Sequence, residues 1–223
     1  MLSKLKKILG VGQSKGTISK KKIARHLPDN PIIIEAGAST GEDTYEMAQL
    51  FPRGTIYAFE PLPNIYDIMS KRVANCPNVK TFQSALSDQT GTATINVSSG
   101  NRNSSSSLMT PKEHLNSHPD ITFDQSIEVP TISLDDFIAE QQLPQIDFLW
   151  LDMQGYEYAV LSASEKIFDS LQLLYTEVSL VETYEGVPLY KEYRQWLESK
   201  GMEVLIEELP WPDMGNVLFR KKQ

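Results

Sequence analysis

The chain has 223 residues, of which 40% are hydrophobic and 22% are charged, and its formal net charge is −8 at pH 7. This length is enough to bury the core of one domain. A single cysteine, Cys76, excludes an intramolecular disulfide framework and a cysteine-rich zinc module. No apolar run approaches the roughly 20 residues that cross a bilayer. We therefore expect a soluble, cytoplasmic, globular protein.

The charge is distributed unevenly along the chain. Residues 1–26 contain eight lysines and arginines and no acid, so residues 27–223 carry a formal charge of −16. An acidic body repels phosphate backbones, and we therefore expect no nucleic-acid partner. We treat residues 1–29 as a basic leader and residues 30–223 as the folded domain.

The leader permits two interpretations. Leu2, Leu5, Ile8 and Leu9 share one helical face beside lysines, which is typical of a weak peripheral contact with an anionic membrane. The alternative is a frayed first helix that packs loosely on the domain. The apolar stretch is too short, and too interrupted by lysine, for a signal peptide.

From residue 30 to residue 90, short apolar runs alternate with helical patterns. Strands are expected at 32–34, 55–59 and 79–82, and helices at 42–51 and 64–74. This alternation predicts a parallel sheet with helices on its faces.

An insert follows at about 92–131. Residues 92–97 and 127–132 alternate like two half-exposed strands of one β-hairpin. Between them, 98–126 has no periodicity and is predicted to be a long polar loop with a short helix near 111–116.

The second half returns to the alternating pattern. Expected elements are a short helix opened at 133–136, strands at 146–151 and 173–178, helices at 154–168 and 188–200, and a final strand pair at 203–206 and 217–220. The whole order predicts a doubly wound, Rossmann-like α/β sheet with an inserted hairpin.

Ligands of such sheets bind at the carboxyl ends of the strands. The first strand ends in Glu35-Ala-Gly-Ala-Ser-Thr-Gly41, where two glycines allow a close approach at a helix start. The dinucleotide fingerprint G-x-G-x-x-G fails here, because Ser39 and Glu42 occupy its second and third glycine positions. The turn instead suits a ligand with a carboxylate and an ammonium group, such as S-adenosylmethionine, beside Glu35. Alternatively, the glycines serve only the turn.

Further candidates follow the next strands. Glu60 lies nineteen residues beyond Gly41, where an acid can accept both ribose hydroxyls, although a surface carboxylate is the alternative. Ser84 and Ala85 are small enough to border an adenine. Asp152 ends the most apolar strand, where an unused carboxylate is costly.

Six segments together resemble the FkbM family of S-adenosylmethionine-dependent methyltransferases. They are residues 33–41, 58–61, 84–91, 105–108, 132–136 and 146–157. The resemblance covers about 30–220 and implies a class I methyltransferase sheet of seven strands, the last one antiparallel.

The resemblance also implies roles for particular residues. The methionine part of the cofactor is assigned to Glu35, Gly37, Ala38 and Gly41, the ribose to Glu60, and the neighbourhood of adenine to Ser84 and Ala85, with Asp152 facing the same crevice. Two departures from the family pattern are Trp150, where many relatives have Lys, and Met153-Gln154, near which they have glutamate or threonine.

The implied reaction is O-methylation of a hydroxyl on a small molecule or sugar. A general base would assist it, and Asp152, Glu157 and Glu177 are the candidates because they follow the fourth and fifth strands of the predicted sheet. Glu157 could instead brace its own helix, and Glu177 could be an internal hydrogen-bond acceptor.

The histidines leave further alternatives. His114 and His118 are four apart in the insert, a spacing that can bind a metal on a helix, but Pro119 favours a solvated loop. We expect no metal, and either histidine could be a base on a closing lid. Two other functions stay open, namely an NAD-type oxidoreductase on the same sheet and a cofactor-binding protein without catalysis.

Overall fold

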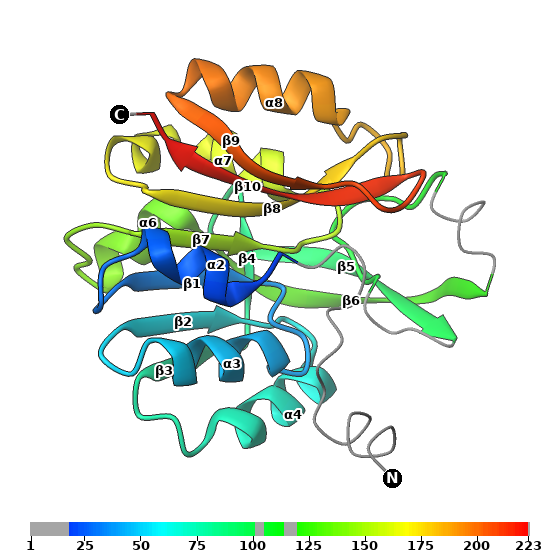
Figure 1. The fold of residues 1–223 in the computed structure, drawn as a ribbon. Coiled ribbons are helices and arrows are strands. Elements are labelled where there is room, and N and C mark those ends of the chain that lie inside the picture. The colour runs from blue at the N-terminus through cyan, green and yellow to red at the C-terminus, as the bar shows by residue number, and fades with distance from the viewer. Residues whose placement is uncertain (1–17, 101–104, 114–119, 223) are drawn as a thin grey trace, which may run out of the picture.

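A computed structural model of the protein describes residues 18–100, 105–113 and 120–222 (Figure 1). Its main sheet has seven strands in the order β3-β2-β1-β7-β8-β10-β9. The strands are β1 Ile32–Ala36, β2 Thr55–Phe59, β3 Val79–Phe82, β7 Phe148–Leu151, β8 Leu173–Ser179, β9 Met202–Glu208 and β10 Met214–Lys221. β10 runs antiparallel to both of its neighbours, β8 and β9, and the other neighbouring strands are parallel to each other. The predicted seven-stranded sheet with an antiparallel last strand is confirmed.

Helices cover both faces of this sheet because alternate strand residues are apolar on both sides. One buried cluster contains Ile33 and Phe148 with residues of α2 and α3, and the other contains Ile34 and Leu149 with residues of α6, α7 and α8. The helices are α2 Lys20–Ile23, η1 Ala24–His26, α3 Glu42–Leu50, α4 Pro63–Val73, α6 Leu134–Glu140, α7 Glu157–Ala163, η2 Glu165–Asp169 and α8 Tyr190–Ser199.

The insert forms a second sheet of three strands in the order β4-β6-β5. Its strands are β4 Ala85–Ser87, β5 Gly91–Gly100 and β6 Ile121–Ser133. The predicted pairing of 92–97 with 127–132 is confirmed, since Ile95 lies opposite Ile127. The strands extend further into 98–126 than predicted, because the exposed residues of β6 are polar and hide the alternation. The short strand β4, parallel to β6, was not predicted.

Two predicted helices differ from the structure. The helix expected over 154–168 is wrong at both ends, because Gln154 and Gly155 have φ angles of 55° and 97° and form a turn before α7. A 3-10 helix, η2, replaces its last turns. In the helix expected near 111–116, Pro111 instead forms a β-bridge with Tyr184, and residues 114–116 lie outside the described part of the chain.

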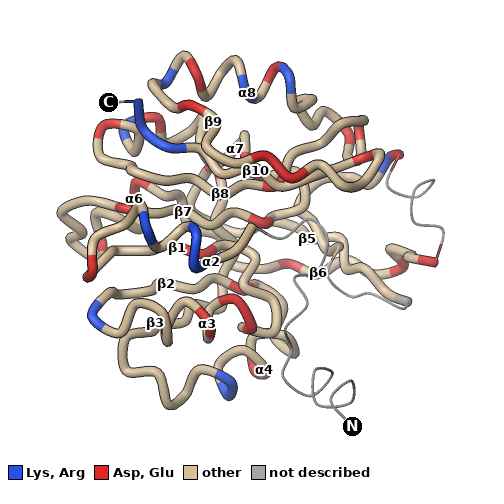
Figure 2. The backbone as a smooth tube through the Cα atoms, viewed as in Figure 1, with Lys and Arg blue, Asp and Glu red and all other residues tan. Residues whose placement is uncertain are grey.

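The described end of the leader packs on the domain. Ile18 and Ile23 are buried in the cluster beneath α3, and Lys20 forms ion pairs with Asp43 and Glu46 of α3. Figure 2 shows the lysines of α2 in blue and the acids of α3 in red. The four apolar leader residues at 2, 5, 8 and 9 lie outside the described residues, so the membrane contact stays a prediction. Among the described helices, none is long and apolar enough to cross a membrane.

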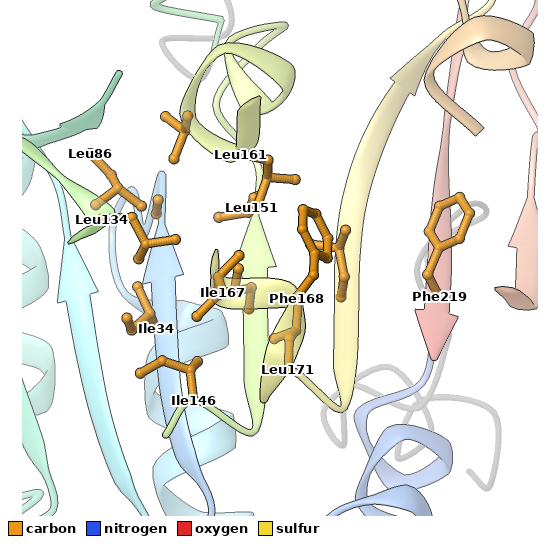
Figure 3. Close-up of a cluster of buried hydrophobic side chains, with 14 of the residues drawn as sticks. Ile34, Leu86, Leu134, Ile146, Leu151, Leu161, Ile167, Phe168, Leu171 and Phe219 are labelled. Carbon is orange, nitrogen blue, oxygen red and sulfur yellow. The ribbon is translucent and has the colours of Figure 1, made fainter. Parts of the chain in front are cut away.

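The insert is fixed to the main sheet by buried side chains. Leu86 of β4 and Leu134 of α6 lie beside Ile34 of β1 in one apolar cluster (Figure 3). Phe137 of α6 packs edge-to-face on Phe59, with ring centroids 4.8 Å apart, and also on Tyr57 and Phe82 at 5.4 and 5.0 Å. These contacts set where the insert stands over the carboxyl ends of β1 and β2.

We expect Phe137→Ala to lower the free energy of unfolding by about 3–5 kcal/mol, because it removes a buried ring and leaves a cavity among three aromatic neighbours. Urea unfolding followed by circular dichroism measures this change. Ile68→Ala on the exposed face of α4 is the control, with a change within about 0.5 kcal/mol. Equal losses in both variants would contradict the packing role of Phe137.

Candidate active site

A cavity of about 640 Å³, including its open mouth, lies at the carboxyl ends of β1, β2 and β7. The insert closes one side of it through β5 and the segment 105–108. Its lining includes Gly37, Ser39, Glu60, Leu62, Ile65, Ser84, Ala85, Ile95, Leu108, Asp152, Met153, Gln154 and Tyr156. The main sheet and the insert therefore build one site together.

The turn after β1 passes very close to the end of β7. Gly37 has a φ of 81°, and a Cβ atom on it would lie 1.8 Å from the carbonyl oxygen of Asp152, so only glycine fits there. The N–H groups of Gly37 and Ala38 both donate to the carbonyl of Phe59, at 3.2 and 2.9 Å, and Gly41 N–H donates to Ala38. These amides are thus occupied within the protein, and the turn offers a ligand a close surface rather than free donors.

Glu60 is a pocket residue rather than a surface carboxylate. Its side chain lines the cavity, and the residue is only 6% exposed. Its Oε1 accepts Leu62 N–H at 2.9 Å and its Oε2 accepts Ser39 N–H at 3.0 Å. Burial raises the pKa of Glu60 to about 7, and the two N–H bonds oppose this rise. Each oxygen keeps a further lone pair, so two vicinal hydroxyls can still bind.

An apolar slot adjoins Glu60. Ala85 of β4 lines it, next to Ser84. Its other walls are Leu62 and Ile65 at the start of α4 with Ile95 and Leu108 of the insert, and none of these four was predicted to line the pocket. The sequence signal that could have placed Leu108 in the pocket is segment 105–108, one of the six segments that resemble the FkbM family. The slot is suited to a planar, largely apolar group such as adenine.

Glu35 lies behind the pocket wall, on the α2 and α3 side of the sheet. It is 1% exposed, it does not line the cavity, and its Oε2 has no hydrogen-bond partner. Burial raises its pKa to about 8, the hydrogen-bonding interaction with Thr44 and the charge of Lys20 oppose this rise, and the charge of Asp43 adds to it. Ala38 and Gly41 also lie outside the cavity lining. The structure thus brings Gly37, Glu60, Ser84, Ala85 and Asp152 into one cavity and holds Glu35 beneath its turn.

Two carboxyl groups meet where β7 and β8 end. The Gln154 amide Nε2 donates to Asp152 Oδ1 at 3.0 Å and to Glu177 Oε2 at 3.1 Å. Burial raises the pKa of both acids, and for Glu177 the charges of Asp152 and Glu157 raise it further. Two half-buried acids that share one amide donor favour holding one proton between them. Gln154 was not predicted as a site residue, since nothing in its sequence position shows that it bridges two strands.

Glu157 braces the turn rather than facing the cavity. It is 3% exposed, and its Oε1 accepts the N–H of Met153 at 2.7 Å. Burial raises its pKa to about 7, against the effect of the backbone bonds. This geometry favours the bracing alternative over a role as base.

Trp150 does not face the cavity. Its ring stacks on Tyr175 with centroids 3.8 Å apart, and Lys20 Nζ lies 5.0 Å from its centre. The family resemblance implies a Lys at this position. Because Trp150 lies outside the pocket wall, its presence removes no group from that wall, and Lys20 supplies a cation beside the ring. His26 lies in η1, whereas His114 and His118 lie outside the described residues.

The residues of the cavity fit S-adenosylmethionine. Glu60 retains lone pairs that can accept ribose hydroxyls, the apolar slot suits adenine, and the carboxyl group of Asp152 lines the same cavity. With the antiparallel last strand, this fold and site define a class I S-adenosylmethionine-dependent methyltransferase.

Comparisons with known proteins agree with that class. The Methyltransferase FkbM domain matches residues 35–204. The 2-O-methyltransferase NoeI of Sinorhizobium fredii is 32% identical over 199 residues, which cover 86% of this chain and 80% of NoeI. Methyltransferase sdnD of Sordaria araneosa is 28% identical, covering 89% of this chain and 84% of that protein. The chain therefore belongs to the FkbM methyltransferase family and uses S-adenosylmethionine.

Solved structures share the fold at low identity. Fibrillarin of Methanococcus jannaschii gives a TM-score of 0.55 at 14% identity, covering 92% of this chain and 75% of that chain. Fibrillarin of Aeropyrum pernix, with natively bound S-adenosyl-L-methionine, gives 0.51 at 15% identity, covering 86% and 68%. The methyltransferase fold is confirmed by both.

We expect Glu60→Gln to weaken S-adenosylhomocysteine binding by about 10–100-fold, because an amide places an N–H₂ group against one of two backbone N–H donors. Calorimetric titration measures the Kd. The pKa of Glu60 is about 7, and ribose hydroxyls donate to the ionised form, so wild-type affinity should rise from pH 6 to 8 and the variant should respond less. The control is Asp67→Asn on the exposed face of α4. Wild-type affinity in Glu60→Gln would contradict this role.

We also expect the ligand-free protein to lose stability as pH rises from 5 to 8. Folded Glu35 keeps its proton up to about pH 8, whereas the unfolded residue releases it near its ordinary pKa of about 4.3, so unfolding becomes easier as pH rises. Glu35→Gln removes this contribution. Urea unfolding from pH 5.5 to 8.5 should show the variant gaining on wild type as pH increases, with Glu140→Gln as exposed control. A pH-independent difference would contradict the buried, protonated state.

Proposed function

We propose that this methyltransferase transfers the methyl group to a hydroxyl oxygen of a small molecule or glycan, with Asp152 as general base. The position of Asp152 carries the proposal, because, of the half-buried pair Asp152 and Glu177, it is the carboxyl group that lines the cavity. The name of the relative NoeI, a 2-O-methyltransferase, supports oxygen as the acceptor atom.

When bound, S-adenosylmethionine supplies a methyl group on a positively charged sulfur. The chain contributes position and proton transfer. Glu60 and the apolar slot orient the nucleoside, and well-oriented reactants can gain roughly 7–11 kcal/mol. Asp152 accepts the proton of the acceptor hydroxyl, a contribution of typically about 10²–10⁴-fold. Its raised pKa brings it closer to neutral pH, where a base is most effective.

Glu177 and Glu157 have supporting roles in this proposal. Glu177 lies on the far side of Gln154 from the cavity and shares the negative charge of the pair. Glu157 holds the Met153 N–H and so fixes the turn that carries Asp152. We infer that neither accepts the substrate proton directly.

The proposed acceptor is not a nucleic acid. Asp124 and Glu128 are exposed on β6, and Glu182 and Glu185 lie in the segment after β8, on the side of the molecule where the insert stands (Figure 2). These acidic side chains repel phosphate groups.

The contact of residues 1–26 with an anionic membrane remains part of this proposal, supported only by their basic, amphipathic sequence.

A labelled-methyl transfer assay over a panel of glycans and hydroxylated small molecules tests the proposal. With the best acceptor, we expect Asp152→Asn to lower kcat by about 10²–10⁴-fold, because the amide cannot take a proton. The Kd for S-adenosylhomocysteine should change by less than about tenfold. Asp169→Asn, an exposed acid at the end of η2, is the control.

Two results would overturn the assignment. Methyl transfer to nitrogen or carbon acceptors alone would exclude O-methylation. Full activity of Asp152→Asn on a hydroxyl acceptor would exclude Asp152 as the base while leaving the methyltransferase class intact.

A further inference from the structure

Tyr184 reaches the acid pair from the segment between β8 and α8. It is fully buried, and its hydroxyl lies 3.1 Å from the carbonyl oxygen of Ser105 and 3.2 Å from Gln154 Oε1. Its ring packs on Gly155, where an added Cβ would lie 3.1 Å from Tyr184 Cδ2. The phenol therefore stands between the insert and the turn that follows β7.

Gln154 is held at every polar atom of its side chain. Both N–H bonds of its amide are directed at carboxylates, those of Asp152 and Glu177, and its Oε1 faces the Tyr184 hydroxyl. Its own backbone carbonyl accepts the hydroxyl of Ser107 at 2.8 Å. The residue also has a φ of 55°, a conformation that non-glycine residues adopt only when their surroundings enforce it.

We propose that Tyr184 is a positioning residue that fixes the Gln154 amide between Asp152 and Glu177 and joins the insert segment 105–109 to this pair. This inference rests on the proposed function in one respect, namely that Asp152 is the general base. Tyr184 does not line the cavity, so the segment after β8 acts on the reaction only through Gln154 and the acid pair.

The charges around the pair show why this position matters. Asp43 of α3, Glu157 of α7 and the phenols of Tyr175 and Tyr184 interact with one or both acids. In the described part of the chain, neither Asp152 nor Glu177 forms an ion pair with a lysine or arginine. The Gln154 N–H groups are thus a main stabiliser of the ionised pair, and loosening them should raise its apparent pKa.

Carboxyl ¹³C chemical shifts of Asp152 and Glu177, followed from pH 4 to 9 in the ligand-free protein, test the proposal. Tyr184→Phe should shift the apparent pKa values of the pair upward by roughly 0.5–1 pH unit, and Gln154→Ala should shift them at least as much. Because Tyr184 acts through Gln154, the double variant should titrate like Gln154→Ala.

A matched control is available in the same region. Tyr193→Phe also removes a buried phenol, whose hydroxyl lies 3.3 Å from Thr176 Oγ1 and not beside Gln154. It should leave the titration unchanged. Hydrogen exchange at the Ser107 amide, which donates to Asn96 at 3.1 Å, should accelerate in Tyr184→Phe and not in Tyr193→Phe, since the phenol anchors the neighbouring Ser105.

If Tyr184→Phe does not fold, a comparison of the wild-type protein with Gln154→Ala still tests the proposal. The ¹³Cζ shift of Tyr184 should follow the titration of the pair in wild type and lose this dependence in Gln154→Ala. A titration of Tyr184→Phe identical to wild type, additive shifts in the double variant, or an insensitive ¹³Cζ shift would each overturn the proposal. Since no acceptor is used, failure of the base assignment in the transfer assay remains a separate result.

Discussion

The site depends on the close contact between the turn after β1 and the end of β7. A side chain on Gly37 would overlap the carbonyl of Asp152, so the two strand ends can meet only with glycine there. That contact places the turn after β1 directly beside Asp152, which the proposed function makes the general base. Parallel pairing of β1 with β7 sets their register, and the order of the sheet makes these strands neighbours although about 110 residues separate them.

The insert completes the site because it is anchored at both of its ends. Leu86 and Leu134 pack into the core beside β1, and Phe137 holds α6 against the aromatic residues of β2 and β3. At the other side, the Ser107 hydroxyl donates to the Gln154 carbonyl, and the backbone of Ser107 pairs with that of Asn96 in β5. Within the described part of the polar stretch, residues 106–108 therefore form part of the cavity wall.

The fold followed from the sequence more fully than the site did. Apolar strands and glycine turns have local signatures, so the succession of elements along the chain and the positions of Gly37, Glu60 and Asp152 after their strands could be predicted, whereas the seven-stranded sheet followed from the family resemblance. The roles of Tyr184 and Gln154 could not be predicted, because they depend on a hydrogen bond between segments thirty residues apart. A single tyrosine or glutamine has no local sequence pattern that would indicate such a contact. Glu35 shows a different limit, since its position at a strand end was predicted correctly while the face to which its side chain turns depends on the packing of α2 and α3.

The concentration of acids at one edge gives the site its chemical character. Burial raises the pKa values of Asp152, Glu157 and Glu177. The charge of Asp152 raises the pKa values of Glu157 and Glu177 further, whereas a hydrogen bond with Glu177 lowers the pKa of Asp152. Such a cluster would oppose folding if all members were ionised, so it persists by sharing protons and by accepting N–H groups from Gln154 and the backbone. In the proposed reaction, the positively charged methyl donor would offset this negative charge, and Asp152 would take up the proton that the acceptor hydroxyl releases. An amide at position 154, rather than a further carboxylate, stabilises the charge of the pair without adding to it.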